Sequence, residues 1–206
     1  ENHESVHFQN LIENEVPLVM FDRVDDRIYC DKVIVDDKGA GYKATKYLLE
    51  KGCKKIGLIT TPEHITVGAL RREGYERAHR EDGVLIEKKR ITEVNEENGL
   101  LQEISALFEQ ELDAIFAVNE IYAALAIRIA KEKGLRIPED ISVIGFTDGL
   151  ISEYSSPSIT TIVQHGYTMG RQAAELLLDR IENKNKNKEP QTKVISSKLK
   201  IRESSV

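Results

Sequence analysis

The stretch 113–149 constrains the fold more than any other part of the sequence, because it holds two short and almost wholly apolar runs at 114–118 and 141–146. Runs this uniformly apolar are typical of strands buried on both faces of a parallel sheet, whereas half-exposed strands alternate apolar with polar residues. The segment between them is long enough for a helix, and Gly134 and Pro138 favour its termination. The stretch therefore predicts a β-α-β unit.

The same alternation of strand and helix continues along the chain. Strand patterns at 56–60 and 90–94 precede the two apolar runs. Each of these strand patterns is followed by a helix pattern, at 67–80 and at 99–110. Four β-α repeats therefore fall between about residues 55 and 148. Four repeats are enough for a compact, doubly wound α/β sheet with right-handed crossovers. The other patterns predict strands at 17–21, 32–35, 159–164 and 194–201, helices at 39–52 and 169–181, and a loop at 149–158.

Composition argues against several kinds of partner. The formal charge of −6 and the pI near 5.5 disfavour binding of nucleic acid or an anionic membrane through the chain's own surface. No apolar run approaches the roughly 18 residues of a transmembrane helix. Cys30 and Cys53 have neither a C-x-x-C spacing nor a histidine beside them, so we predict a reduced, cytoplasmic protein without a metal site.

The sequence also lacks the motifs of enzymes built on doubly wound sheets. It contains no G-x-G-x-x-G and no G-x-x-x-x-G-K-[ST] motif, and Gly39-Ala40-Gly41 lacks the third glycine at the required spacing. A G-x-S-x-G nucleophile elbow is absent as well. We therefore predict a protein that is not an enzyme and that uses no cofactor.

Polar residues follow the two apolar runs, where ligands of parallel sheets bind. Such ligands lie beyond the carboxyl ends of the strands, and here those ends are Asn119-Glu120 and Thr147-Asp148. We therefore expect the functional residues of this chain at these positions. An asparagine after a strand also fits a helix N-cap, so Asn119 has a structural interpretation beside the functional one.

Seven segments, taken in order and spacing, resemble the lactose-repressor (LacI/GalR) family of bacterial transcription regulators. The resemblance covers nearly the whole chain and concerns the effector-binding core, which shares its fold with periplasmic sugar-binding proteins. The segments are VPLVMFDR (16–23), VDDKGAGYKATKYLLEKGCKKIGLIT (35–60), RREGYERA (71–78), DAIFAVNE (113–120), IPEDISVIGFTD (137–148), TTIVQ (160–164) and IRES (201–204).

The resemblance implies a periplasmic-binding-protein-like type I fold, with two doubly wound parallel-sheet lobes joined by three crossovers. Residues 1–53 and 160–192 are expected in an incomplete N-terminal lobe, and 54–159 and 193–206 in the C-terminal lobe. A DNA-binding headpiece, a hinge and the first strands of the N-terminal lobe are expected before Glu1.

The implied function is that of the effector-binding and dimerisation core of a LacI-type regulator. A small polar effector, a sugar or sugar derivative, is expected in the cleft between the lobes, where it controls DNA binding allosterically. Operator DNA would be bound only through the headpiece, and the core would form a cytoplasmic homodimer without membrane contact. The alternative is a periplasmic-type sugar-binding receptor.

Six residues are expected to bind the ligand. Four of them match the family's motifs, namely Asp22, Arg71, Asn119 and Gln164, and the other two, Thr147 and Asp148, occupy the two positions after the aromatic residue of GFTD. Carboxylates, amides and an arginine fork are the groups that recognise polyols. The chain departs from the family at Thr147, where an acidic residue is usual. A hydroxyl at this position argues against a close analogue of the commonest sugars, unless Asp148 replaces the missing carboxylate.

Each of these positions also has a structural interpretation. Arg71 could be a solvated arginine on a helix surface, and Asp22 could form a surface ion pair with Arg23. Gln164 could satisfy backbone groups where the chain crosses between lobes. His165 replaces a frequent proline of the family, and we interpret it as a surface histidine.

Overall fold

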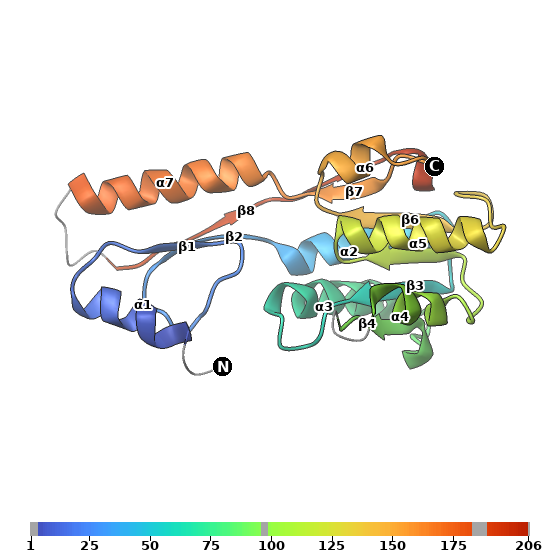
Figure 1. Cartoon of the computed structure of the whole chain (residues 1–206), viewed down its shortest axis with the longest axis horizontal. Coiled ribbons are helices and arrows are strands. Elements are labelled where there is room, and N and C mark those ends of the chain that lie inside the picture. Colours follow the sequence, from blue (N-terminus) through green and yellow to red (C-terminus); the bar gives the residue numbers. More distant parts are fainter. Residues whose placement is uncertain (1–3, 96–98, 183–188, 206) are drawn as a thin grey trace. The chain divides into compact units, whose positions relative to one another are not determined.

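The computed structural model describes residues 4–95, 99–182 and 189–205 (Figure 1). The chain divides into two compact units. The smaller unit consists of Glu1–Asp36 and His165–Ser196, and the larger unit of Asp37–Gln164 and Ser197–Val206. The chain therefore passes from one unit to the other three times, as the family resemblance implies.

The larger unit is built on a six-stranded sheet with the order β4-β3-β5-β6-β7-β9. Its strands are parallel except for β9, which runs antiparallel to β7. This α/β architecture with mainly parallel strands confirms the predicted fold class. The strands are β3 (Ile56–Thr60), β4 (Ile91–Glu93), β5 (Ala114–Ala117), β6 (Ser142–Phe146), β7 (Thr160–Val163) and β9 (Lys198–Lys200).

Helices connect these strands and bury their apolar faces in one core. Helices α2 and α3 pack closely on each other, and α4 packs on α5. The strands β3 and β5 are buried at every residue, which explains their uniformly apolar sequence. The helices are α2 (Asp37–Glu50), α3 (Thr66–Glu81), α4 (Leu100–Leu107), α5 (Glu120–Glu132) and α6 (Leu150–Tyr154), with short 3-10 turns at Lys88–Arg90 and Glu203–Ser205.

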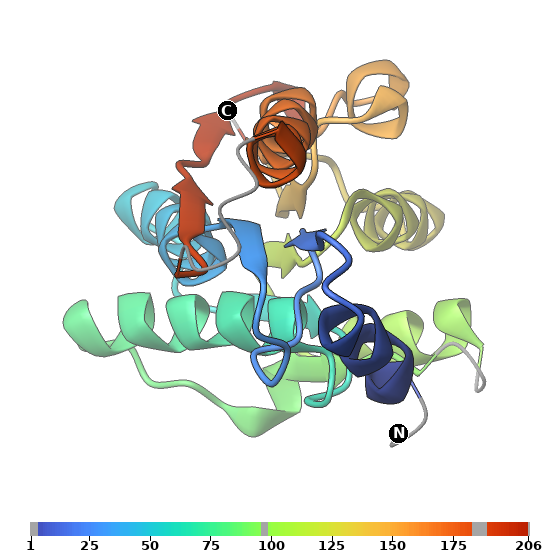
Figure 2. The same ribbon diagram turned by 90° about the vertical axis from the view of Figure 1, so that its left-hand side faces the viewer.

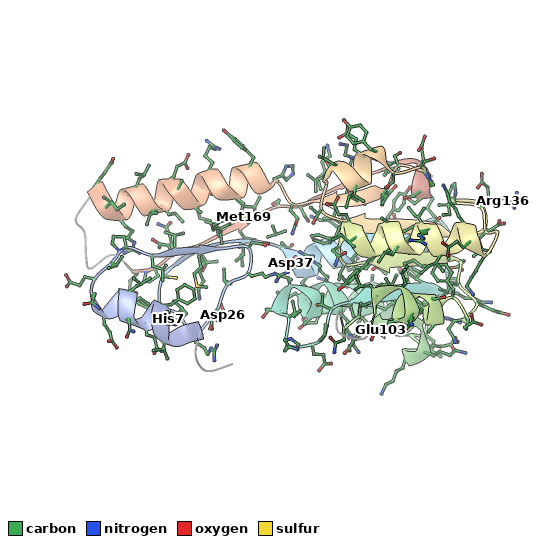
Figure 3. All side chains as sticks on the ribbon, viewed as in Figure 1. His7, Asp26, Asp37, Glu103, Arg136 and Met169 are labelled. Atoms are coloured by element: carbon green, nitrogen blue, oxygen red, sulfur yellow. The ribbon has the colours of Figure 1, made fainter. Side chains whose placement is uncertain are left out.

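The smaller unit contains a three-stranded parallel sheet with the order β1-β2-β8. Helices α7 and α1 lie on opposite sides of this sheet (Figures 1 and 2). Met169 of α7 is buried and points toward the strands (Figure 3), where it joins Val33, Val35 and Ile195 in a small core. The elements are α1 (Glu4–Glu13), β1 (Val19–Phe21), β2 (Asp31–Val35), α7 (Gly166–Glu182) and β8 (Thr192–Ile195).

The compact units have different boundaries from the predicted lobes. The prediction placed 1–53 with 160–192, whereas α2 and β7 belong to the larger unit. Helix α2 belongs to the larger unit because it packs closely on α3, where Gly41 and Gly74 allow the two backbones to approach. β7 pairs with β6 in the six-stranded sheet.

Two local predictions need correction. The single strand expected at 194–201 is two strands, because β8 pairs in one sheet and β9 in the other. The loop expected at 149–158 contains α6, whose first turn is held by Glu120: its Oε2 accepts hydrogen bonds from the backbone N and Oγ of Ser152, at 3.4 and 3.2 Å.

Over the part of the chain that the structure describes, no helix is long and apolar enough to cross a membrane. The same residues contain no group of three His, Cys, Asp or Glu side chains arranged to hold a metal ion.

His79 is a buried histidine on α3 that gives the fold a pH dependence. Its Nδ1–H donates to the Tyr75 carbonyl oxygen at 3.0 Å, and burial lowers the pKa of the imidazole from its ordinary value of 6.5. The folded state therefore favours the neutral imidazole. The stabilisation that this gives is fully present above the ordinary pKa of 6.5 and is lost as the pH falls below 6.5. Between about pH 7.5 and about pH 5.5 the free energy of unfolding should therefore fall less in His79→Gln than in the parent, as measured by urea denaturation. Equal falls would contradict this role of His79.

Candidate functional site

The structure places five of the six predicted ligand-binding residues in the larger unit and Asp22 in the smaller unit. Asp22 directly follows β1. Asn119, Thr147 and Gln164 lie just beyond β5, β6 and β7, which are neighbouring parallel strands, so the three side chains share one edge of the sheet.

Arg71 of α3 is not the solvated arginine that its sequence position allows. Only 6% of the residue is exposed. Its Nε donates to Oδ1 of Asp37 at 2.7 Å, Nη2 lies 2.7 Å from the same oxygen, and Nη1 donates to the Val118 carbonyl oxygen at 2.7 Å. The guanidinium carbon lies 3.5 Å from the centroid of the Phe146 ring. Arg71 therefore connects the ends of β5 and β6, through the residues that precede Asn119 and Thr147.

Asp37 is the residue of this site that sequence reasoning missed. It is the first residue of α2 (Figure 3). It is as deeply buried as Arg71. An acidic residue at a helix start is ordinarily explained by the helix dipole, and Asp36 beside it offered the same signal. Only the packing of α2 on α3, which brings Asp37 to Arg71, distinguishes the two carboxylates.

Asn119 is the N-cap of α5, where its Oδ1 accepts a hydrogen bond from the Tyr122 backbone N at 2.8 Å. The structural interpretation of Asn119 is therefore realised. The cap engages Oδ1, so hydrogen bonding to a ligand would fall mainly to the amide nitrogen. Capping also fixes the orientation of the side chain at the end of β5.

Thr147 and Gln164 are joined across the ends of β6 and β7. The Thr147 Oγ1 donates to the Gln164 Oε1 at 2.9 Å, and the Thr147 backbone N donates to the Ile162 carbonyl oxygen at 2.9 Å. The two side chains thus form one polar pair, rather than two independent groups.

Three positions beyond strand ends have left-handed backbones although none is glycine. The φ angles are +64° at Asp22, +80° at Thr147 and +55° at His165. This region is sterically unfavourable for residues with a Cβ, and most of all for a β-branched residue such as Thr147. Strained backbones of this kind cluster at functional sites, and all three lie where ligands of parallel sheets bind.

Asp148 is held by two cations that follow in the chain. Its carboxylate lies 3.2 Å from Nζ of Lys200 and forms a second ion pair with Arg202. Partial burial opposes ionisation, but the hydrogen bonds from Arg202 and Lys200 outweigh it and keep the pKa of Asp148 below its usual value. Since Lys200 pairs with Thr161 in the middle of β7, this carboxylate is directed toward β9.

Replacing Thr147 with glycine tests the backbone strain. The change relieves roughly 1–3 kcal/mol of strain but removes a hydrogen bond worth about 1 kcal/mol and adds flexibility costing roughly 0.5–1 kcal/mol. We therefore expect the free energy of unfolding in urea to change by less than about 1 kcal/mol. Thr92→Gly in β4, at an ordinary strand position, should be more destabilising; the reverse order would exclude strain at Thr147.

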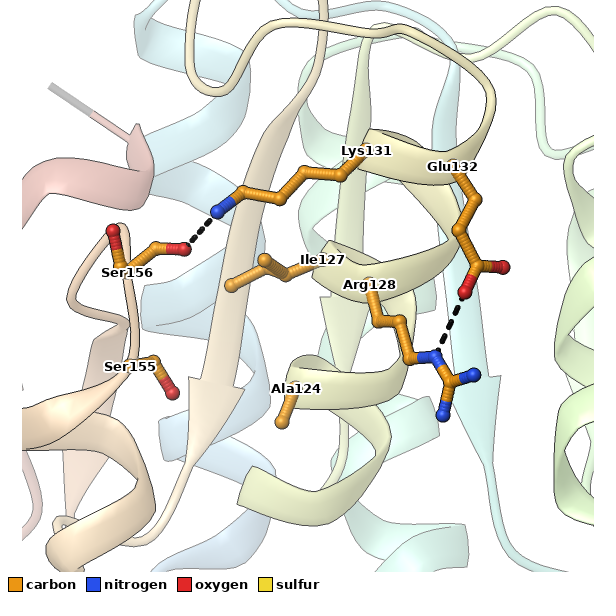
Figure 4. A pocket seen from close by; sticks show the side chains of 7 residues that line it. All are labelled: Ala124, Ile127, Arg128, Lys131, Glu132, Ser155 and Ser156. Atoms are coloured by element: carbon orange, nitrogen blue, oxygen red, sulfur yellow. Dashed lines mark hydrogen bonds and ion pairs between the residues drawn. The ribbon is translucent and has the colours of Figure 1, made fainter.

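A shallow groove of about 340 Å³ lies elsewhere on the larger unit, between α5 and the turn after α6 (Figure 4). Lys131 Nζ donates to the Ser156 carbonyl oxygen across it, and Arg128 pairs with Glu132 along its rim. None of the six predicted residues lines it. Its lining consists of Ala124, Ile127, Arg128, Lys131, Glu132, Ser155 and Ser156.

A mainly parallel sheet with polar residues at adjacent strand ends is typical of ligand-binding α/β domains, among them those of the periplasmic-binding-protein type. Residues 45–205 match the sequence model of the periplasmic binding protein-like domain family, and the chain belongs to this family. Relatives and solved structures that are similar to this chain confirm the predicted relation to the effector-binding cores of LacI-family regulators.

Curated relatives include the HTH-type transcriptional repressor PurR of Haemophilus influenzae (strain PittEE), which is 38% identical over 177 residues, or 83% of this chain and 53% of the relative. The repressor of the same name from Aliivibrio fischeri (strain ATCC 700601 / ES114) is 37% identical over 175 residues, or 82% of this chain and 52% of the relative. The chain thus spans about half the length of the curated relatives it matches.

Solved structures agree with this relation. A complex of the transcriptional regulator CelR with cellobiose has a TM-score of 0.85 and 30% sequence identity, over 96% of this chain and 61% of that protein. A LacI-family regulator from Enterococcus faecium with bound ribose has a TM-score of 0.86 and 28% identity, over 98% and 75% of the two chains.

Proposed function

We propose that this chain is the effector-binding core of a transcription repressor and binds a small polar ligand, a sugar or sugar derivative. The ligand would be held at the carboxyl ends of the strands of the larger unit, where Asn119, Thr147 and Gln164 lie. Ligand binding would control a DNA-binding segment outside this sequence, in a cytoplasmic homodimer. Such control requires that the ligand bind one arrangement of the lobes better than the other.

The observation that carries this proposal is the position of Arg71. Its guanidinium donates to the carbonyl oxygen of Val118, immediately before Asn119, and lies 3.5 Å from the ring centroid of Phe146, immediately before Thr147, so one buried side chain contacts the ends of both strands. A side chain held this firmly has little conformational entropy to lose when a ligand arrives, which favours binding.

The comparisons support a carbohydrate ligand without assigning one. Cellobiose and ribose are bound in two of the similar structures. The relatives are named transcriptional repressors, which supports regulation of transcription and does not favour the alternative of a periplasmic receptor or an enzyme.

The test is a thermal-shift screen against neutral sugars, sugar phosphates, nucleobases and nucleosides. A ligand present at about 100 times its Kd adds about 2.7 kcal/mol to the free energy of unfolding, so a true effector should raise the melting temperature clearly. The rise should be reduced in Thr147→Ala and in Gln164→Leu, which remove the polar pair at the strand ends. Arg128→Ala, in the groove away from the site, is the matched control and should keep the full rise. A ligand that shifts all four proteins equally would place binding elsewhere.

A further inference from the structure

We propose that Asp37 determines the charge class of the ligand: by neutralising Arg71, it makes the site select neutral over anionic ligands. This inference rests on the proposed function, because it concerns the same site. It adds a residue that the family motifs do not point to, and it predicts that phosphorylated or carboxylated relatives of the true effector are rejected.

The first step is the pairing of charges. The side chains of Arg71 and Asp37 are only 7% and 6% exposed, and two guanidinium nitrogens lie 2.7 Å from one carboxylate oxygen. A phosphate or carboxylate is bound best by an arginine fork whose charge is not already compensated. Here the fork faces Asp37, so the Arg71–Asp37 pair presents almost no net charge to a ligand.

The second step concerns the charges of the other predicted ligand-binding residues in the larger unit. Asn119, Thr147 and Gln164 are neutral, and the nearest carboxylate after β5 belongs to Glu120, which accepts a hydrogen bond from the Ser152 hydroxyl. The cations Lys200 and Arg202 are engaged by Asp148, beside β9. An anion bound against Arg71 would therefore meet a guanidinium whose charge Asp37 already balances, and its desolvation would not be offset there. Neutral hydroxyl, carbonyl or ring nitrogen groups can be satisfied by the same amides, hydroxyl and N–H donors.

The third step identifies Asp37, rather than Arg71, as the residue that decides. Asparagine is nearly the same size as aspartate, and its Oδ1 can still accept from Nε of Arg71. Asp37→Asn therefore keeps the shape of the site and gives it one unit of positive charge. The variant should acquire affinity for anions that the parent lacks.

Inorganic phosphate is a suitable probe, because its use does not depend on knowing the effector. Melting temperatures are measured in chloride and in phosphate at equal ionic strength. We expect no specific rise for the parent and a saturable rise for Asp37→Asn. Asp140→Asn is the matched control, because Asp140 also pairs with an arginine, Arg136, but on the exposed surface. It removes the same charge and should give no phosphate-dependent rise in melting temperature.

Binding of the sugar panel provides an independent measurement on the parent. If ribose binds, ribose 5-phosphate should bind at least about 100-fold more weakly, and Asp37→Asn should narrow or reverse this ratio. Equal affinities of the parent for the two would overturn the inference. If no member of the panel binds, the proposed function fails on its own, while the phosphate experiment still decides the role of Asp37.

Loss of Asp37 leaves a buried cation, so the variant could be isolated unfolded. Phosphate should then restore the folded state by replacing the lost carboxylate, whereas chloride should not. A variant that folds but gains no phosphate-dependent rise, or that stays unfolded equally in both salts, would overturn the inference.

Discussion

Gly74→Ala is expected to destabilise the larger unit by about 3 kcal/mol, at the upper end of the range for overpacking. A Cβ at this position would lie 2.2 Å from the Lys38 carbonyl oxygen and 2.5 Å from the Tyr42 backbone N. Both atoms belong to the backbone of α2, so no side-chain rotation relieves the clash, and the two helices must separate. Urea denaturation measures the loss.

Gly170→Ala is the matched control, because it makes the same change in helix α7, where a Cβ has no neighbour within 4 Å. There alanine should be neutral or stabilise by up to about 1 kcal/mol, through the lower flexibility of the unfolded chain. Equal effects of the two substitutions would show that the close approach of α2 and α3 is unimportant for stability.

The second large effect is expected in the smaller unit, from Arg180→Met. Asp31 is almost completely buried, and its carboxylate accepts hydrogen bonds from Nε and Nη2 of Arg180 at 2.7 and 2.9 Å and from the Gln191 backbone N at 2.8 Å. Removing one partner of a buried ion pair costs about 3–5 kcal/mol, because the other charge is left uncompensated. The core of this unit is small, so the loss should open it before the larger unit unfolds.

Hydrogen exchange followed by mass spectrometry tests this expectation, since it reports the two units separately. Amides of β2 and β8 should exchange much faster in Arg180→Met, while those of β3 and β5 should not change. Arg171→Met, on the same helix but in an exposed pair with Glu175, is the control and should leave exchange unaltered. Protected β2 and β8 amides in Arg180→Met would show that the pair with Asp31 is dispensable.

The parts of the fold that could be predicted from the sequence are those that the chain encodes locally. The strands β3, β5 and β6 are buried on both faces, so their apolar runs stood out. The boundary between the units was harder, because it depends on which neighbour α2 packs against, and this is decided by glycines on two separate helices. The division of 194–201 into β8 and β9 depends likewise on pairing with distant strands.

The candidate site shows the same distinction. Asn119 and Thr147 were found because they follow strands, and Gln164 was found through the family resemblance; the structure does bring the three to adjacent strand ends. Local sequence carries no sign that Asp37 meets Arg71, since the partners are 34 positions apart and come from different helices. Nor does it show that Asp148 is engaged by Lys200 and Arg202, which lie more than 50 positions later.

The discontinuity of both units has a consequence for how the chain folds during synthesis. The smaller unit lacks its third strand until β8 has been made. The larger unit needs β9 and the hydroxyl of Ser204, which donates to the Val143 carbonyl oxygen and accepts from the Thr160 backbone N. The three-stranded sheet of the smaller unit therefore cannot be completed until β8 has left the ribosome, and the six-stranded sheet of the larger unit cannot be completed until β9 has. Until then the apolar faces of β2 and α7 stay open to chaperones and to wrong partners.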